Sequence, residues 1–185
     1  MFVYDFDHTV YNGDSSVDFH KYCMHKNPGI LLKVPGFCVA VLLYKVNRIS
    51  KEKMKEKWFA FLSKIDADTY VEAFWKGYRK KLKKWYLEKD HSNDVIISAS
   101  PEFLLRGICG ELGVYKLIAT DMDKNTGKIT GLNCHGEEKV TRFFGELQGE
   151  IIDEFYTDSM SDLPMLEHAK NGFVVKKDRL TVFEG

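Results

Sequence analysis

Cysteine is scarce in this chain, and no two cysteines stand close together. The four thiols, Cys23, Cys38, Cys109 and Cys134, form no Cys-x-x-Cys pair, which argues against a zinc site or a dithiol redox site. We expect buried free thiols in a reducing compartment. This favours a cytoplasmic location.

Long apolar runs are also missing. The longest uncharged run, residues 34–44, is well below the roughly 20 residues that cross a bilayer. The first predicted strand begins at Phe2, which we expect to leave no room for a cleaved signal peptide. For the wider apolar stretch 30–46, two interpretations stay open: a segment that lies on a membrane, or a core helix kinked at Pro35.

A net charge is absent, but the charges are unevenly distributed. Residues 11–90 carry 17 Lys and Arg against 9 Asp and Glu, which leaves an excess of 8 positive charges, and the rest of the chain carries the opposite excess. Such an uneven distribution of charge gives information about what the protein binds. It indicates an anionic substrate or surface facing the middle segment, most of all near the basic run 76–84, or simply lysines that solvate helix faces. We expect no nucleic-acid partner.

What the chain does have is a globular composition, with 44% apolar and 14% aromatic residues over 185 positions. This length suits one domain with an insertion. Short apolar runs at 2–4, 95–97, 115–120 and 151–156 alternate with helical patterns, as in an α/β fold. Two further strands are expected near 172–176 and 180–183.

Two residues with carboxylate side chains come directly after the first of these strands. Asp5 and Asp7 follow the apolar run Phe2–Tyr4, and open α/β sheets bind ligands at the carboxyl ends of their strands. Residues two apart in an extended chain face the same side, so the two acids repel unless a cation lies between them. A divalent metal bound together with a phosphorylated substrate would relieve this repulsion. A plain surface turn is the alternative.

Serines follow the strand at 95–97. In Ser98-Ala-Ser-Pro101, Ser100 is expected to cap a helix that has Pro101 at its first position. A helix N-terminus beyond a strand is an anion site, and the Ser98 hydroxyl adds a donor.

Two later segments bring a lysine and further acids. Lys139 stands near the start of a helix opened by Gly136, where a cation opposes the helix dipole. A bound anion would explain it, although a surface lysine would need no explanation. The strand at 151–156 then leads to Asp158 and Asp162.

The remaining helical patterns are read from caps and apolar stripes. Ser15 or Ser16 is expected to cap the first helix and Ser50 a later one, with another starting after Asp66 or Asp68. Residues 127–134 are expected to form a hairpin.

The ordered set Asp5-Phe-Asp-His-Thr9, Ile-Ile-Ser98, Lys139 and Asp158-Ser-Met-Ser-Asp162 resembles the haloacid dehalogenase superfamily. This resemblance implies a Rossmann-like parallel sheet core at 1–10 and 91–185, with an all-helical cap inserted at 11–90. Ser98-Ala-Ser-Pro101 and the Gly-x-x-Lys139 context resemble the phosphoserine phosphatase branch. The proline-interrupted stretch 30–46 and Cys134-His-Gly-Glu-Glu-Lys139 resemble bacterial phosphatidylglycerophosphatases of the C type.

The resemblance also implies roles for these residues. Asp5 would be the nucleophile that forms an aspartyl-phosphate, and Asp7 the general acid and base. The Asp5 and Asp158 carboxylates and the Asp7 carbonyl would bind Mg²⁺. Ser98 and Lys139 would bind the phosphoryl group. Asp162 and Thr9 would support the residues that touch the substrate or the metal.

The implied activity is hydrolysis of a phosphomonoester. A lipid phosphate such as phosphatidylglycerophosphate is the expected substrate, with peripheral contact at the inner face of an anionic membrane. A soluble metabolite such as phosphoserine is the alternative, although the family's amine-binding glutamate position falls on Asp14, which is expected to be a turn or capping residue. A phosphotransferase, or a catalytically silent module that docks on membranes, also stays open.

Overall fold

The computed structural model describes residues 1–184, and a six-stranded sheet in the order β3-β2-β1-β4-β5-β6 forms its centre. The first five strands in chain order are parallel, and β6 runs antiparallel to β5. The predicted α/β fold with a parallel sheet is therefore confirmed. The strands are β1 (Phe2–Tyr4), β2 (Asp94–Pro101), β3 (Lys116–Thr120), β4 (Glu154–Thr157), β5 (Asn171–Lys176) and β6 (Arg179–Val182).

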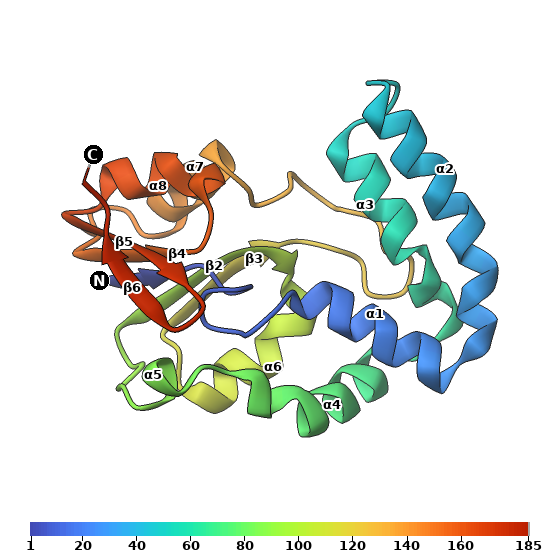
Figure 1. Cartoon of the computed structure of the whole chain (residues 1–185), viewed down its shortest axis with the longest axis horizontal. Coiled ribbons are helices and arrows are strands. Elements are labelled where there is room, and N and C mark those ends of the chain that lie inside the picture. Colours follow the sequence, from blue (N-terminus) through green and yellow to red (C-terminus); the bar gives the residue numbers. More distant parts are fainter. Residues whose placement is uncertain (185) are drawn as a thin grey trace.

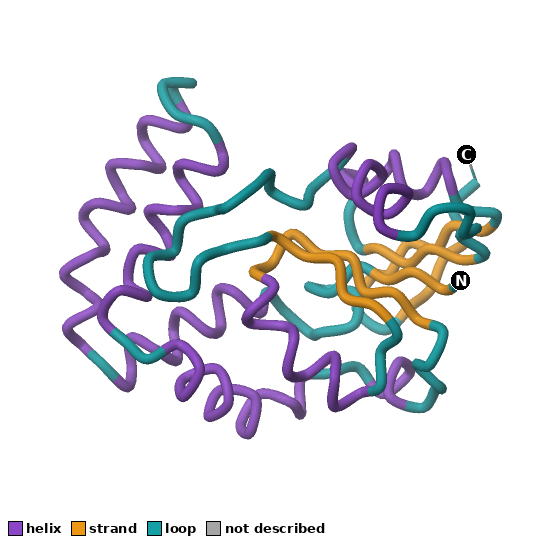
Figure 2. The backbone as a smooth tube through the Cα atoms, turned by 180° about the vertical axis from the view of Figure 1, so that it is seen from behind, coloured by secondary structure: helices purple, strands orange, loops and turns teal. Residues whose placement is uncertain are grey.

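Eight α-helices surround the sheet within the described residues 1–184 (Figure 1). Helices α7 and α8 lie on one side of the sheet, α4 to α6 lie on the other, and α2 and α3 project beyond its end, as the view from behind also shows (Figure 2). Five of them, α1 to α5, come between β1 and β2, so the helical insertion after the first strand is confirmed; its boundaries at 11 and 90 stay a prediction. The helices are α1 (Ser15–Lys26), α2 (Val34–Lys45), α3 (Lys51–Phe59), α4 (Ala67–Tyr78), α5 (Lys84–Leu87), α6 (Glu102–Leu112), α7 (Glu137–Glu146) and α8 (Leu163–His168), with 3-10 segments η1 (Pro28–Lys33), η2 (Ala60–Lys64), η3 (Arg79–Lys81) and η4 (Met160–Asp162).

Strand β1 lies in the middle of the sheet, between β2 and β4. Its side chains alternate, as a strand requires: Val3 belongs to the core under α7, and Tyr4 to the aromatic core on the other face, where it stacks on Tyr156 at 4.7 Å. Burial on both faces explains the short uninterrupted apolar run. The parallel pairing places the carboxyl ends of β1, β2 and β4 next to one another.

The cap of α1 differs from the expected one. Asp14 accepts a hydrogen bond from the Val17 amide at 2.8 Å and is the N-cap, not Ser15 or Ser16. The capping role expected for Asp14 is thus confirmed. Both serines are buried and lie 3.3 Å and 2.9 Å, respectively, from the Ser100 hydroxyl. Ser50 does cap α3, through the Lys53 amide.

Two predictions around β2 and β3 are wrong. Ser100 belongs to β2, and Pro101 is the residue that precedes α6, because the Ser100 side chain is engaged elsewhere. Residues 127–134 form a loop with a single bridge, Met122 to Ile129, instead of a hairpin. Gly127 has φ +74°, and a Cβ there would lie 2.4 Å from the Phe59 carbonyl oxygen. The loop is therefore packed closely against the end of α3.

The apolar stretch does not form a kinked core helix. Pro35 lies in the first turn of α2, where its ring is compatible with the helix, and Ile30 and Ala40 are the buried residues of η1 and α2. By length and composition, Pro28–Lys45 could cross a membrane: its mean hydropathy is 1.5, and 11% of it is buried. Core helices and signal sequences meet the same criteria. Cys38 in this stretch is exposed, against expectation, whereas the other three thiols are buried.

Candidate active site

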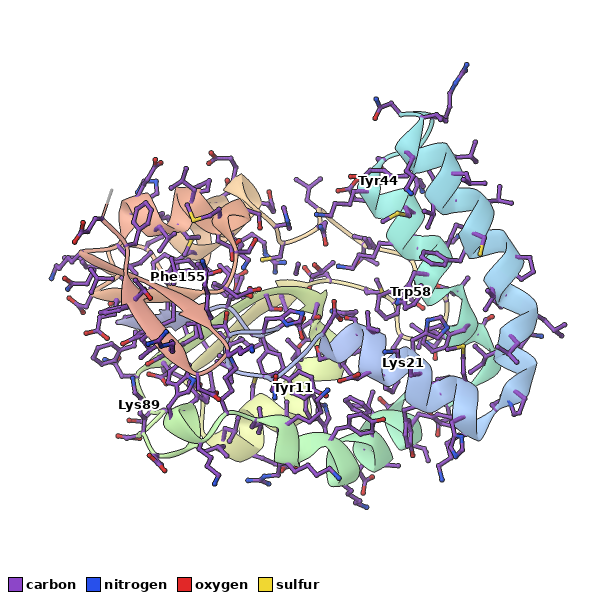
Figure 3. All side chains as sticks on the ribbon, viewed as in Figure 1. Tyr11, Lys21, Tyr44, Trp58, Lys89 and Phe155 are labelled. Atoms are coloured by element: carbon purple, nitrogen blue, oxygen red, sulfur yellow. The ribbon has the colours of Figure 1, made fainter. Side chains whose placement is uncertain are left out.

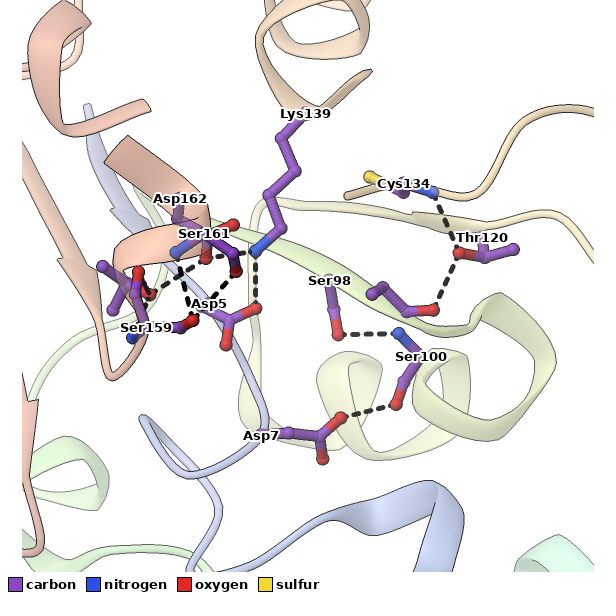
Figure 4. A network of polar contacts seen from close by, with 12 residues as sticks. Asp5, Asp7, Ser98, Ser100, Thr120, Cys134, Lys139, Ser159, Ser161 and Asp162 are labelled. Carbon is purple, nitrogen blue, oxygen red and sulfur yellow. Dashed lines mark hydrogen bonds and ion pairs between the residues drawn. The ribbon is translucent and has the colours of Figure 1, made fainter. Parts of the chain in front are cut away.

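Asp5 and Lys139 meet at the carboxyl end of β1. The Lys139 Nζ donates to Asp5 Oδ1 at 2.7 Å and to Asp162 Oδ2 at 2.7 Å (Figure 4). Residues from the ends of β1, α7 and η4, far apart in sequence, thus form one buried ion cluster.

Lys139 is 2% exposed, although it lies in the first turn of α7. Burial alone would lower its pKa, but the Asp5 and Asp162 carboxylates outweigh burial and raise the pKa. The lysine therefore stays protonated. Thr157 at the end of β4 donates to Asp162 at 2.9 Å, which fixes the carboxylate that orients the ammonium group.

Asp7 lies on the other side of the same loop and has different partners. Its Oδ1 accepts from the Ser15 amide at 2.6 Å, and its Oδ2 accepts from the Ser100 hydroxyl at 2.5 Å. Burial, assisted by the Asp14 charge, raises the pKa of Asp7 to about 6 in spite of the hydrogen bonds, which lower it. An acid with such a pKa holds a proton more readily than an exposed aspartic acid does.

Ser98 is buried at the end of β2, close to both aspartates (Figure 4). Its hydroxyl accepts a hydrogen bond from the Ser100 amide at 3.1 Å. The hydroxyl proton of Ser98 is thus left to point toward an acceptor in the site.

Asp158 and Thr9 complete the predicted set. Asp158 lies in the turn after β4 and is half-buried; burial raises its pKa, and the His8 charge opposes this. Thr9 is fully buried, and its hydroxyl has no hydrogen-bond partner among residues 1–184. Its contribution to the first loop is therefore packing. His8, at φ 58°, is exposed.

The carboxylates outnumber the cations in this site, which bears on metal binding. Residues 1–184 contain no group of three or more His, Cys, Asp or Glu side chains that could hold a metal ion. The predicted Mg²⁺ ligands differ from such a group, because they combine the Asp5 and Asp158 carboxylates with the Asp7 carbonyl. Asp5 Oδ1 accepts a hydrogen bond from Lys139, and no residue in 1–184 donates a hydrogen bond to Asp5 Oδ2. Free hard oxygens in a negatively charged setting fit Mg²⁺.

Sequence reasoning missed Lys55 and Asn133 near the site, and it assigned Ser100 a different role, that of a helix cap. Ser100 contacts Asp7, a contact that the two-residue strand spacing from Ser98 could have indicated. Lys55 of α3 donates to Asn133 Oδ1 at 2.7 Å and also to the Ala99 carbonyl. No local signal marks Lys55 or Asn133, because their contact joins segments 78 residues apart.

A cavity of about 310 Å³ opens beside Asp7. Most of its wall is apolar, and α1, α2 and α3 supply much of that wall, including Val17, Phe37, Met54 and Trp58. A larger cavity of about 730 Å³ between α4 and α6 has none of the predicted site residues in its lining. The smaller one is therefore the candidate binding pocket.

The profile of the haloacid dehalogenase-like hydrolase family matches residues 2–167. A Mycobacterium tuberculosis H37Rv protein named "Probable phosphatase" is 37% identical over 92 residues, which cover 46% of this chain. This chain spans about a third of that relative's length, 32%. A histidinol-phosphatase of Neisseria meningitidis serogroup C is 23% identical, with 95% of this chain and 90% of that protein covered.

Solved structures share the fold. A Bordetella pertussis Tohama I protein of unknown function superimposes with a TM-score of 0.77 at 21% identity, covering 93% of this chain and 87% of that one. A phosphoserine phosphohydrolase-like protein of Francisella tularensis gives 0.57 at 18% identity, covering 92% and 84%. A phosphoserine phosphatase described as a phospho-aspartyl intermediate analogue gives 0.56 at 13% identity, covering 92% and 83%.

Proposed function

This chain belongs to the haloacid dehalogenase-like hydrolases, and from this premise we propose that it hydrolyses phosphomonoesters through an aspartyl-phosphate on Asp5. The observation that carries the proposal is the Asp5 carboxylate at the end of the central strand, held by Lys139 at 2.7 Å, with a second acid two residues on. A carboxylate fixed through one oxygen presents the other for attack.

In the first half of the reaction, Asp5 Oδ2 forms a bond to phosphorus while the bond from phosphorus to the leaving oxygen breaks. Asp7, whose pKa is raised to about 6 by burial, gives its proton to that oxygen. The products of this half are an alcohol and the aspartyl-phosphate.

In the second half, Asp7 takes a proton from a water molecule, which attacks phosphorus. The bond between Asp5 and phosphorus breaks, and inorganic phosphate leaves. Lys139 and the Ser98 hydroxyl stabilise the phosphoryl oxygens throughout, because they are fixed before the reaction begins. When bound at the Asp5 and Asp158 carboxylates and the Asp7 carbonyl, Mg²⁺ would supply positive charge against the phosphoryl group.

For the substrate, we propose a phosphomonoester with an apolar leaving group, such as the lipid phosphatidylglycerophosphate. The largely apolar wall of the 310 Å³ cavity beside Asp7 supports this. The soluble alternatives are phosphoserine and histidinol phosphate, after the named activities of similar proteins. A phosphotransferase would use the same residues, and a product analysis with acceptor alcohols separates it from a hydrolase.

Release of phosphate from an aryl phosphate tests the chemistry. We expect activity that requires Mg²⁺, disappears with a chelator and is abolished by Asp5→Asn. Asp153→Asn, at an exposed carboxylate that pairs with Lys170 at 2.7 Å, is the matched control and should retain activity. No release of phosphate by the unmodified chain with Mg²⁺ would favour the silent binding module.

A substrate panel tests the specificity separately. Phosphatidylglycerophosphate in mixed micelles should give a higher kcat/KM than phosphoserine or histidinol phosphate. Equal or better turnover of a soluble substrate would reject the lipid, while leaving the reaction class intact.

A further inference from the structure

The outer face of η1 and α2 carries apolar side chains that no residue in 1–184 covers. Leu32 is 83% exposed, Leu42 64% and Val46 62%, and Val39 between them is also exposed. Positions 32, 39, 42 and 46 follow the spacing of one helix face. We call these four residues the outer stripe.

The opposite face of α2 is packed. Phe37 contacts Trp58 of α3, with ring centroids 4.5 Å apart, and Ala40 is buried. Helix α2 is thus apolar on both faces but covered on one, with α3 between it and the sheet (Figure 1). Figure 3 shows Tyr44 and Trp58 on this outlying pair of helices. An exposed apolar face of this kind marks an interaction site.

The segment of sequence that contains the outer stripe carries charges of one sign. Residues 19–51 contain no Asp or Glu, but six Lys and Arg. The ion pairs formed within residues 1–184 involve none of the six. The cations are Lys21, Lys26, Lys33, Lys45, Arg48 and Lys51.

The basic run at 76–84 is different, and it leaves few free charges. Lys76 pairs with Glu72 at 2.6 Å, Arg79 pairs with Glu111 at 2.6 Å, and Lys81 pairs with Asp18. Lys83 is buried and donates to backbone carbonyls. In this run, only Lys80 and Lys84 have neither an ion pair nor a hydrogen-bonded ammonium group within residues 1–184, whereas all six cations of 19–51 lie outside the ion pairs.

We propose that the outer stripe docks on an anionic lipid surface, with α2 lying flat in the interface. Apolar side chains flanked by cations match the acyl boundary and the headgroups of such a surface. A second copy of this chain matches less well, because a symmetric contact would bring the same cations together. Insertion across the bilayer would separate α2 from α3 and expose the Phe37 contact. The anionic surface fits the inner face of a membrane, where such lipids concentrate.

Flotation with vesicles tests docking without any substrate, so its result is independent of the proposed hydrolysis. The full chain should float with vesicles of equal parts phosphatidylcholine and phosphatidylglycerol, and not with phosphatidylcholine alone. High salt should release it, because the headgroup attraction is screened.

Two valines of the same exposure give a matched pair of variants. Val46→Glu should lower the bound fraction about tenfold, because it puts a like charge against the headgroups and removes apolar contact. Val182, 61% exposed on β6 at the other end of the molecule, serves as the control, and Val182→Glu should bind as the unmodified chain does. Both positions are exposed, so folding should survive, as circular dichroism would show.

Three results would overturn docking: no flotation with the anionic vesicles, equal binding to both kinds of vesicle, or equal loss in the two variants. A dimer in solution that Val46→Glu converts to a monomer, with no flotation, would assign the outer stripe to a second copy instead.

Discussion

Lys139 lies 2.7 Å from Asp5 Oδ1 in a buried pair, although the two residues are 134 positions apart in the sequence. The same ammonium group is 2.7 Å from Asp162. Removing it would leave two buried carboxylates facing each other with no cation between them.

Lys139→Met should therefore abolish phosphatase activity and lower the free energy of unfolding by roughly 3 kcal/mol. Lys170→Met is the control, because Lys170 pairs with Asp153 at the same 2.7 Å, but its side chain is 58% exposed. Such surface pairs contribute between about 0 and 1 kcal/mol. Urea unfolding and an aryl phosphate assay measure both effects; equal destabilisation by the two changes would contradict the account.

Ser100→Ala tests the positioning of Asp7. The Ser100 hydroxyl donates to Asp7 Oδ2 at 2.5 Å, and a hydrogen bond to a charged group contributes about 1.5–3 kcal/mol. We expect kcat to fall roughly tenfold to a hundredfold with KM little changed, since Ser100 acts through Asp7. Ser92→Ala removes a similar bond to the exposed Asp90 and should have no effect. A rise in KM alone would show that Ser100 binds substrate instead.

Lys55 ties α3 to the ends of β2 and β3. It donates to the Ala99 carbonyl and to Asn133, and burial, first of all, lowers its pKa to about 8. Lys55→Met should raise KM about tenfold, by loosening the wall of the cavity beside Asp7, and should speed amide exchange in α3. Lys57→Met, on the exposed side of the same helix, is the control. Unchanged exchange in α3 would mean that Lys55 holds nothing in place.

His20 makes the stability of the insertion sensitive to acid. Its ring stacks on Phe61 at 4.4 Å, and neither ring nitrogen has a partner within residues 1–184. Burial lowers the pKa of His20 from 6.5 to about 4. Between these two pKa values the unfolded chain binds the proton and the folded chain does not, so stability is lost as the pH falls.

His20→Phe should remove this loss. From about pH 7.5 to about pH 5, the unmodified chain should lose roughly 2 kcal/mol more than the variant in its free energy of unfolding. His25→Phe, at an exposed position of the same helix, should leave the pH dependence of the free energy of unfolding as it is in the unmodified chain. A pH dependence shared by all three chains would assign the acid sensitivity to other groups.

Local sequence patterns predicted the strands of the sheet and placed the acidic residues at the carboxyl ends of these strands. Asp5 and Asp158 directly follow β1 and β4, Ser98 directly follows the apolar run 95–97 within β2, and in parallel strands such positions converge. The strands, and the shared end of the sheet at which these residues meet, were therefore predictable from the sequence.

Contacts between distant segments were beyond local patterns. Asp14 caps α1 because Ser15 and Ser16 turn toward Ser100 of β2, and no single segment contains that information. Likewise, the apolar composition of α2 is equally compatible with a buried helix and with the exposed one observed.

In the proposed mechanism, Asp5 becomes phosphorylated during turnover. An acid quench of the unmodified chain with a labelled phosphomonoester and Mg²⁺, followed by peptide mass spectrometry, measures this directly. We expect a phosphoryl group on the peptide that contains Asp5, released by hydroxylamine and absent from Asp5→Asn. Label on any other residue, or turnover that persists in Asp5→Asn, would contradict it.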